Sequence, residues 1–303
     1  MEIGVFTKTF ERETIEDVFE AVKEYGYTCV QLNWESAGQA EMPEGVEGAV
    51  CDRIRASAAS RGIGIAGVSG TFNMIHPDPA VREDGIHRLR AVAEACKAVG
   101  SQVVTLCSGT RDAGYMWRRH PDNDTPEAWQ DLVVSMREAV QIAEEAEVTV
   151  AFEPEVANTV DSAKKARRLL DEIGSPRLKV VIDGANVFHA GELTRMPEIL
   201  DEAFDLLGQD IALAHAKDLD RDGAAGKLAA GTGLLDYDRY AGLLRASGFK
   251  GGWVAHGLDE SQAASVQAFL LGALTRSGYA GPPSPPSPGL PPADHPLPHA
   301  GEG

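Results

Sequence analysis

The feature that most constrains the fold is the regular alternation of short apolar runs with longer amphipathic segments. Eight runs rich in Val, Ile, Leu and Ala are typical of buried strands, and each precedes a segment with apolar residues at helical spacing. Such alternation predicts a parallel sheet, because parallel strands need a crossover connection, usually a helix. The predicted strand and helix pairs are 3–6 with 14–25, 28–32 with 46–61, 63–68 with 80–99, 102–107 with 126–146, 148–153 with 160–173, 178–183 with 196–207, 211–215 with 237–247, and 252–256 with 261–274.

Eight such units most economically close into a (β/α)8 TIM barrel, an α/β single domain with its active site at the C-terminal strand ends. An open doubly wound sheet would instead need a glycine-rich phosphate loop after the first strand, but that loop reads Thr7-Lys8-Thr9-Phe10. We therefore expect one barrel over residues 1–275. Residues 276–303 are rich in Pro, Gly and Ser and are expected to be disordered, with a Pro-rich docking segment as the alternative.

The charge balance bears on the partners of the chain. Lys and Arg number 28 against 46 Asp and Glu, a net charge of −18. Binding to a nucleic-acid backbone or an anionic membrane depends on clustered Lys and Arg, so we expect neither partner. The absence of a signal-peptide pattern and of a CxxC pair among the four cysteines predicts a cytoplasmic protein with reduced thiols. The sequence leaves a homo-oligomer open.

Four consecutive predicted strands end in a side chain that can bind a metal: Glu153, Asp183, His215 and His256. A carboxylate at the end of a buried strand is costly unless a metal, a proton or hydrogen-bond donors compensate it. The C-terminal ends of barrel strands meet at one mouth, so these side chains can converge. Two carboxylates and two imidazoles suit one divalent cation of intermediate hardness. We expect Mn²⁺ first, with Zn²⁺, Co²⁺, Fe²⁺ or Mg²⁺ as alternatives.

Residues 1–275 resemble the xylose isomerase-like TIM barrel superfamily of sugar phosphate isomerases and epimerases. The resemblance rests on Phe-Glu-Pro at Glu153, Ile-Asp-Gly-Ala-Asn at Asp183, His-Ala-Lys-Asp at His215, and the segment 231–236. It implies that Glu153, Asp183 and His215 bind metal. The last strand of the family usually ends in Glu, where this chain has His256. In the epimerases the two glutamates also exchange a proton with the substrate, so we expect Glu153, with His256 as its partner, to be catalytic here.

The expected substrate-binding residues surround these ligands. The resemblance places Asn186 where several relatives have a His that helps to bind substrate or metal. The loop 107–123 is long enough to be a lid, and its arginines and tryptophan can clamp a phosphate, a carboxylate or a sugar ring. Salt bridges from these arginines to acidic helices are the alternative. The expected substrate contacts are Asn186, Lys217, Arg111, Trp117, Arg118 and His76.

We therefore expect a divalent-metal-dependent isomerase or epimerase of a sugar or sugar derivative. The metal would bridge adjacent carbonyl and hydroxyl oxygens and stabilise an enediolate. One alternative is a dehydratase or lyase of a keto-inositol or keto-glycoside at the same site. The others are apurinic endonuclease-like DNA repair, which the net charge of −18 disfavours, and a non-catalytic barrel that binds a ligand.

Overall fold

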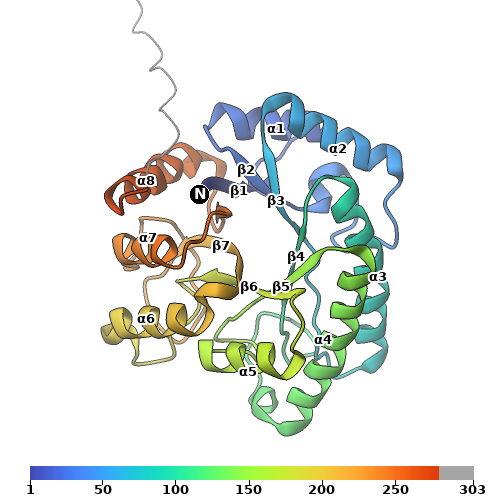
Figure 1. The fold of residues 1–303 in the computed structure, drawn as a ribbon, viewed down its shortest axis with the longest axis vertical. Coiled ribbons are helices and arrows are strands. Elements are labelled where there is room, and N and C mark those ends of the chain that lie inside the picture. Colours follow the sequence, from blue (N-terminus) through green and yellow to red (C-terminus); the bar gives the residue numbers. More distant parts are fainter. Residues whose placement is uncertain (280–303) are drawn as a thin grey trace, which may run out of the picture.

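Eight parallel strands close into a barrel in the computed structural model, which describes residues 1–279 (Figure 1). Neighbouring strands pair in the order β1–β2–β3–β4–β5–β6–β7–β9, and β9 pairs with β1 to complete the ring. The predicted barrel is confirmed, and the open doubly wound alternative is wrong. The barrel strands are β1 (Glu2–Phe6), β2 (Cys29–Leu32), β3 (Gly64–Ser69), β4 (Val103–Cys107), β5 (Thr149–Glu153), β6 (Leu178–Asp183), β7 (Ile211–Asp218) and β9 (Gly252–Ala255).

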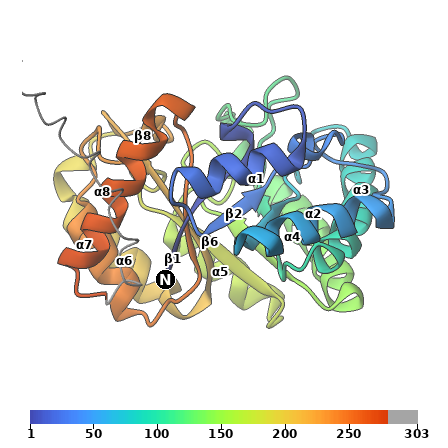
Figure 2. The same cartoon turned by 90° about the horizontal axis from the view of Figure 1, so that it is seen from above.

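Eight helices surround the barrel, one after each strand unit, as Figures 1 and 2 show. Several begin where the sequence offers a capping side chain: Thr14, Asp78 and Ser162 each accept a backbone N–H of the first turn. The helices are α1 (Ile15–Glu24), α2 (Gly48–Arg61), α3 (Pro79–Ala98), α4 (Pro126–Ala146), α5 (Ala163–Ile173), α6 (Met196–Leu207), α7 (Tyr237–Ala246) and α8 (Ala263–Arg276).

Most elements lie within two residues of their predicted boundaries, and two differ by three residues. Strand β7 continues beyond His215 to Asp218, because its last two residues pair antiparallel with the short strand β8 (Leu228–Ala229). Helix α5 begins at Ala163 rather than at residue 160, because the Ser162 side chain accepts the N–H of Lys165 and starts the helix there. The connection between β7 and α7 is therefore a hairpin beyond the strand ends and not an open loop.

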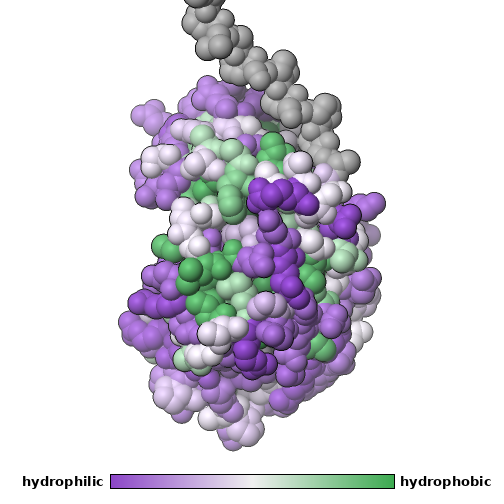
Figure 3. Space-filling model, turned by 90° about the vertical axis from the view of Figure 1, so that its left-hand side faces the viewer, coloured by the Kyte–Doolittle hydropathy of each residue, from purple (hydrophilic) through white to green (hydrophobic). Residues whose placement is uncertain are grey.

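The end of the described chain packs on the barrel. Helix α8 ends at Arg276, and the Tyr279 hydroxyl donates to the Phe249 carbonyl at 2.6 Å, so the first four residues of the predicted tail are ordered. The rest of that tail, 280–303, lies outside the described residues. Within 1–279, none of the helices has the length and apolar composition needed to cross a membrane. Figure 3 shows apolar areas interrupted by hydrophilic side chains on the side of α6–α8, and a homo-oligomer stays a prediction.

A small apolar layer fills the barrel below the predicted metal ligands. Ala151, Val181, Leu213 and Val254 form one buried cluster with Phe6, separate from the large core between sheet and helices. Each of the four lies two residues before one of the predicted ligands. Because strand side chains alternate with a period of two, each ligand points to the same inner face as its apolar predecessor. The fold therefore directs all four ligands into the mouth of the barrel.

Substitution of two helical glycines by alanine can test how tightly the helices pack. A Cβ at Gly85 in α3 would overlap the Phe72 ring, whereas a Cβ at Gly242 in α7 meets no atom within 4 Å. We expect Gly85→Ala to lower the free energy of unfolding by about 1–3 kcal/mol through overpacking. Gly242→Ala should raise it by roughly 0.5–1 kcal/mol through helix propensity. Urea denaturation measures both, and shifts of the same sign would contradict the packing described here.

Candidate metal centre

Four side chains from neighbouring strands converge at the mouth of the barrel. The possible ligand atoms of Glu153, Asp183, His215 and His256 all lie within 4.8 Å of one another. Glu153 and Asp183 end β5 and β6, His215 is level with Asp183 in the β6–β7 register, and His256 follows β9 directly. The predicted convergence of these four residues is confirmed.

The spacing of the donor atoms fits a shared cation. His215 Nδ1 lies 3.3 Å from Glu153 Oε2, and His256 Nε2 lies 3.3 Å from Asp183 Oδ2. Two ligands bonded to one ion at about 2.0–2.2 Å, at a tetrahedral angle, lie about 3.4 Å apart. His215 Nδ1 is also buried without a hydrogen-bond partner among the described residues. A buried unpaired nitrogen facing a carboxylate is costly, and a divalent cation between the two removes that cost.

The orientation of His215 depends on Gln31, which the sequence analysis missed. Gln31 Oε1 lies 2.8 Å from His215 Nε2, and the Gln31 amide nitrogen donates to the hydroxyls of Ser69 and Thr105 at 3.1 Å each. These two acceptors orient the amide so that its oxygen faces the imidazole. His215 Nε2–H therefore donates to Gln31, which leaves the lone pair of Nδ1 for the metal side, as outer partners of metal-bound histidines commonly do.

The buried carboxylates are held in their ionised forms. Burial alone would raise the pKa of Asp183, but the charge of Lys217 and the contact with His256 hold it well below its usual value. Ala185 N–H donates to Asp183 Oδ1 at 2.9 Å. Burial would likewise raise the pKa of Glu153, and His215 and Lys217 outweigh it, so that pKa is also lowered. Both carboxylates are available as anionic ligands at neutral pH.

His256 is held as a neutral imidazole. Burial and the nearby charge of Lys217 lower the pKa of His256 to about 4. Its ring stacks on Phe6, with centroids 4.6 Å apart and planes 10° from parallel. A neutral imidazole keeps the lone pair that metal binding requires. The chain therefore supplies two anionic and two imidazole positions.

A cleft of about 500 Å³, here called the central cleft, opens above these ligands. Glu153, His215 and His256 line it, whereas Asp183 lies below, fully buried. Four of the expected substrate contacts also line the central cleft: Asn186, Lys217, Trp117 and Arg118. Asn186 Nδ2 donates to Glu153 Oε1 at 2.5 Å, and its Oδ1 is a buried acceptor without a partner among the described residues. Asn186 therefore both holds Glu153 and offers an acceptor inside the site.

The other two expected contacts, Arg111 and His76, do not line the central cleft. Arg111 turns back onto α4, where it pairs with Asp131 at 2.7 Å, and it also donates to the Ile75 carbonyl. His76 Nδ1 accepts the N–H of Asp78 at 3.1 Å. Both side chains brace loops, and their expected contact with substrate stays a prediction. The salt-bridge interpretation holds for Arg111.

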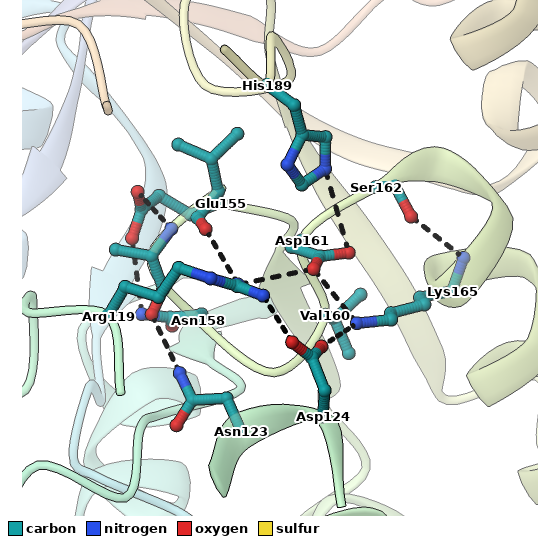
Figure 4. A network of polar contacts seen from close by, with 12 residues as sticks. Arg119, Asn123, Asp124, Glu155, Asn158, Val160, Asp161, Ser162, Lys165 and His189 are labelled. Carbon is teal, nitrogen blue, oxygen red and sulfur yellow. Dashed lines mark hydrogen bonds and ion pairs between the residues drawn. The ribbon is translucent and has the colours of Figure 1, made fainter. Parts of the chain in front are cut away.

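A charged network fixes the wall of the cleft (Figure 4). Asp161 accepts from Arg119 at 3.3 Å and from Lys165 at 2.9 Å, and His189 Nε2 lies 3.9 Å from its other oxygen. Asp124 pairs with Arg119 and Lys165 as well. The network joins the loops that follow β4, β5 and β6. Arg119 is thus used to hold the wall together.

Glu155 is another carboxyl group on the central cleft, which Glu41 also lines, and it lies two residues after Glu153. Its oxygens accept from Ala157 N–H at 2.9 Å and from Asn158 Nδ2 at 3.2 Å, and burial raises its pKa to about 7. It does not belong to the converging group of four. Glu153 is therefore the ligand candidate on this strand, and Glu155 provides a matched control.

We expect the protein to bind one divalent cation per chain, measured by elemental analysis and chelator competition. Loss of a residue that only hydrogen-bonds to a metal ligand weakens metal binding by about 10–100-fold. The double variant Glu153→Gln/Asp183→Asn removes two ligands and should weaken binding by more than that. Glu155→Gln, which removes a neighbouring carboxylate of the same cleft, should keep the metal. Retention by the double variant would rule out this ligand set.

Gln31→Leu should weaken metal binding by about 10–100-fold, because His215 loses the partner that orients it. Ser69→Ala is the control, since it removes one contact of Gln31 but leaves the Gln31–His215 contact. The same chelator competition measures both variants. Equal affinities of Gln31→Leu and the unmodified protein would show that His215 is oriented by other contacts.

No curated protein matches the chain. Among solved structures, the apo 3-keto-D-glucoside 4-epimerase YcjR from E. coli is 19% identical with a TM-score of 0.68, covering 90% of this chain and 99% of that one. The D-psicose 3-epimerase from Clostridium cellulolyticum H10, with D-tagatose, is 15% identical, with a TM-score of 0.68 and coverages of 90% and 99%. The IOLI protein with a bound zinc atom is 17% identical, with a TM-score of 0.71 and coverages of 91% and 99%.

At these identities the structural likeness shows a shared fold. The family described as xylose isomerase-like TIM barrel matches residues 19–268, which is most of the chain. The protein therefore belongs to the xylose isomerase-like TIM barrel family.

Proposed function

We propose that this protein is a divalent-metal-dependent isomerase or epimerase that moves a proton at the carbon beside a carbonyl group of a sugar or sugar derivative. The observation that carries the proposal is the group of four possible ligands beneath a cleft of about 500 Å³. One of these ligands, His215, has a buried Nδ1 without a hydrogen-bond partner among the described residues. A cleft of this size suits a small polar ligand. Family membership and the epimerases among the structural neighbours support the same reaction class.

Glu153, Asp183, His215 and His256 would hold the cation. When bound, it would withdraw electrons from adjacent carbonyl and hydroxyl oxygens, which acidifies the carbon between them and stabilises an enediolate. Mn²⁺ is the ion we propose first, and the zinc atom of the IOLI protein makes Zn²⁺ the next choice.

Glu153 is the proposed proton acceptor. Its carboxylate is ionised and lines the central cleft, and the hydrogen bond from Asn186 fixes one of its oxygens. A general base must lie within about 3 Å of the proton that it accepts, or act through one water. Lys217 also lines the cleft, 3.5 Å from Asp183, and its ammonium can donate to a substrate oxygen. Asn186 Oδ1 can accept from a substrate hydroxyl.

The identity of the product depends on His256, which stands where the family usually has a second glutamate. If the imidazole exchanges a proton on the opposite face of the carbon, the reaction is an epimerisation. If it serves only as a ligand, Glu153 alone supports proton transfer between adjacent carbons or loss of a β-leaving group. The neutral, stacked state of His256 is the observation that keeps a lyase of a keto-inositol or keto-glycoside as the second candidate.

Solvent deuterium exchange tests the reaction class. With Mn²⁺ or Zn²⁺ supplied, NMR in D₂O should show metal-dependent loss of the proton beside the carbonyl in one or more of a panel of keto sugars. Glu153→Gln should slow exchange by about 10²–10⁴-fold, the usual contribution of a general base. Glu138→Gln, an exposed carboxylate on α4, should not slow it.

The products separate the candidates. An epimer or an aldose–ketose pair supports the leading proposal, and an unsaturated ketone with release of water or an alcohol supports the lyase. Exchange that is independent of metal, or no exchange with any keto sugar tested, would contradict the proposed function and favour a non-catalytic barrel.

A further inference from the structure

Two lysines at the mouth of the barrel lack the ion pairs that most other lysines form. Lys97, Lys164, Lys165, Lys179 and Lys217 each have a carboxylate within 4.0 Å. Within residues 1–279, Lys8, Lys23, Lys227 and Lys250 form no such pair. Four of the nine lysines thus have no ion pair among these residues, although the chain has 46 acidic residues. Lys8 and Lys227 both line the central cleft, and Lys23 and Lys250 do not.

Lys8 and Lys227 also line a second cleft of about 660 Å³, here called the side cleft. The two clefts share Phe6, Lys8, Lys227 and His256 as lining residues, so they meet beside the metal ligands. Thr9 and Gln262 line the side cleft and add neutral hydrogen-bond donors, whereas the Thr232 hydroxyl already donates to the Ala229 carbonyl. Asp259, its acidic residue, already caps the short helix that begins at Glu260.

The barrel topology explains why these lysines meet. Lys8 follows β1, Lys227 precedes β8 in the hairpin after β7, and β1, β9 and β7 are neighbours in the sheet. Lys8 Nζ lies 5.6 Å from the centroid of the Phe6 ring, which itself stacks on His256. A Cβ at Gly257, next to His256, would lie 3.7 Å from the Lys227 carbonyl oxygen. The two lysines therefore come from the loops on either side of His256.

The arginines near the central cleft are already occupied. Arg118 pairs with Asp112 at 3.1 Å, and Arg119 pairs with Asp124 and Asp161. Among the described residues that line the two clefts, the cations without an ion pair are Lys8 and Lys227, so the anion-clamp role expected for the arginines suits the lysines better.

We propose that the substrate is an acidic keto sugar, whose carboxylate or phosphate group lies between Lys8 and Lys227 where the two clefts meet. This inference rests on the proposed function, because the sugar carbons beside the carbonyl would occupy the central cleft. An ammonium without a competing carboxylate forms strong charge-assisted bonds to anionic oxygens. The local positive charge also attracts an anion that the net charge of −18 would otherwise repel.

A matched set of three ligands tests the proposal: D-fructose, D-fructuronate and D-fructose 6-phosphate. They differ at carbon 6, which carries a hydroxyl, a carboxylate or a phosphate. Calorimetric titration of the Mn²⁺-loaded protein should show at least about tenfold tighter binding of one or both anionic ligands than of D-fructose, a preference that weakens with added salt. The stronger of the two anions identifies the acidic group.

The preference should disappear in Lys8→Met/Lys227→Met and persist in Lys23→Met/Lys250→Met, which makes the same charge change at unpaired lysines outside both clefts. Lys8→Arg/Lys227→Arg should keep much of the preference, because it keeps both charges. Equal binding of neutral and anionic ligands, an unchanged preference in Lys8→Met/Lys227→Met, or no binding of any of the three would overturn the proposal.

The two proposals fail in different ways. Tight binding of the anions without deuterium exchange would support the anion site and would rule out the proposed enediolate reaction. Deuterium exchange on D-fructose, with no preference for binding the anions, would support the proposed reaction and would rule out the proposal of an acidic substrate.

Discussion

The structure of this site depends on one electrostatic constraint: two ionised carboxylates, Glu153 and Asp183, lie together where little water reaches them. Each raises the cost of ionising the other, and burial adds to it. Lys217, Asn186 and the N–H of Ala185 compensate part of that charge. His215 Nδ1 still faces Glu153 Oε2 at 3.3 Å and has no hydrogen-bond partner among the described residues. A divalent cation resolves both problems at once, since it supplies positive charge and accepts the lone pair.

The rest of the barrel holds these groups still. The Tyr240 hydroxyl donates to the carbonyls of Ile182 and His215, and the Trp253 ring N–H also donates to the His215 carbonyl. These bonds fix the ends of β6 and β7 from the outside, while Gln31 fixes the His215 ring from the inside. The ligands therefore keep their spacing through contacts made by the protein alone, so the site is pre-organised for a cation.

The sequence predicted the features that depend on local periodicity. Alternating strands and helices define the barrel, and a polar side chain at the end of an apolar run lies at the mouth. The four ligands could therefore be predicted from the sequence. The features that it missed depend on contacts made only after closure. Gln31 meets a histidine 184 residues away, and its one signal was a polar residue within the buried run Cys29–Leu32. The pair of Arg111 with Asp131 was likewise not predictable as a specific contact, because Asp131 comes from the following helix.

His256 connects the ligand set with the charge of the mouth. Two carboxylates and two neutral imidazoles balance a divalent cation, whereas a glutamate in place of His256 would add a negative charge to the floor of the cleft. That charge would repel an anionic group bound nearby. With His256, the four ligands would balance the charge of a bound divalent cation, and Lys8 and Lys227 add positive charge to the adjacent rim. The substitution at the last strand and the two unpaired lysines therefore act in the same direction: both lower the electrostatic cost of an acidic substrate.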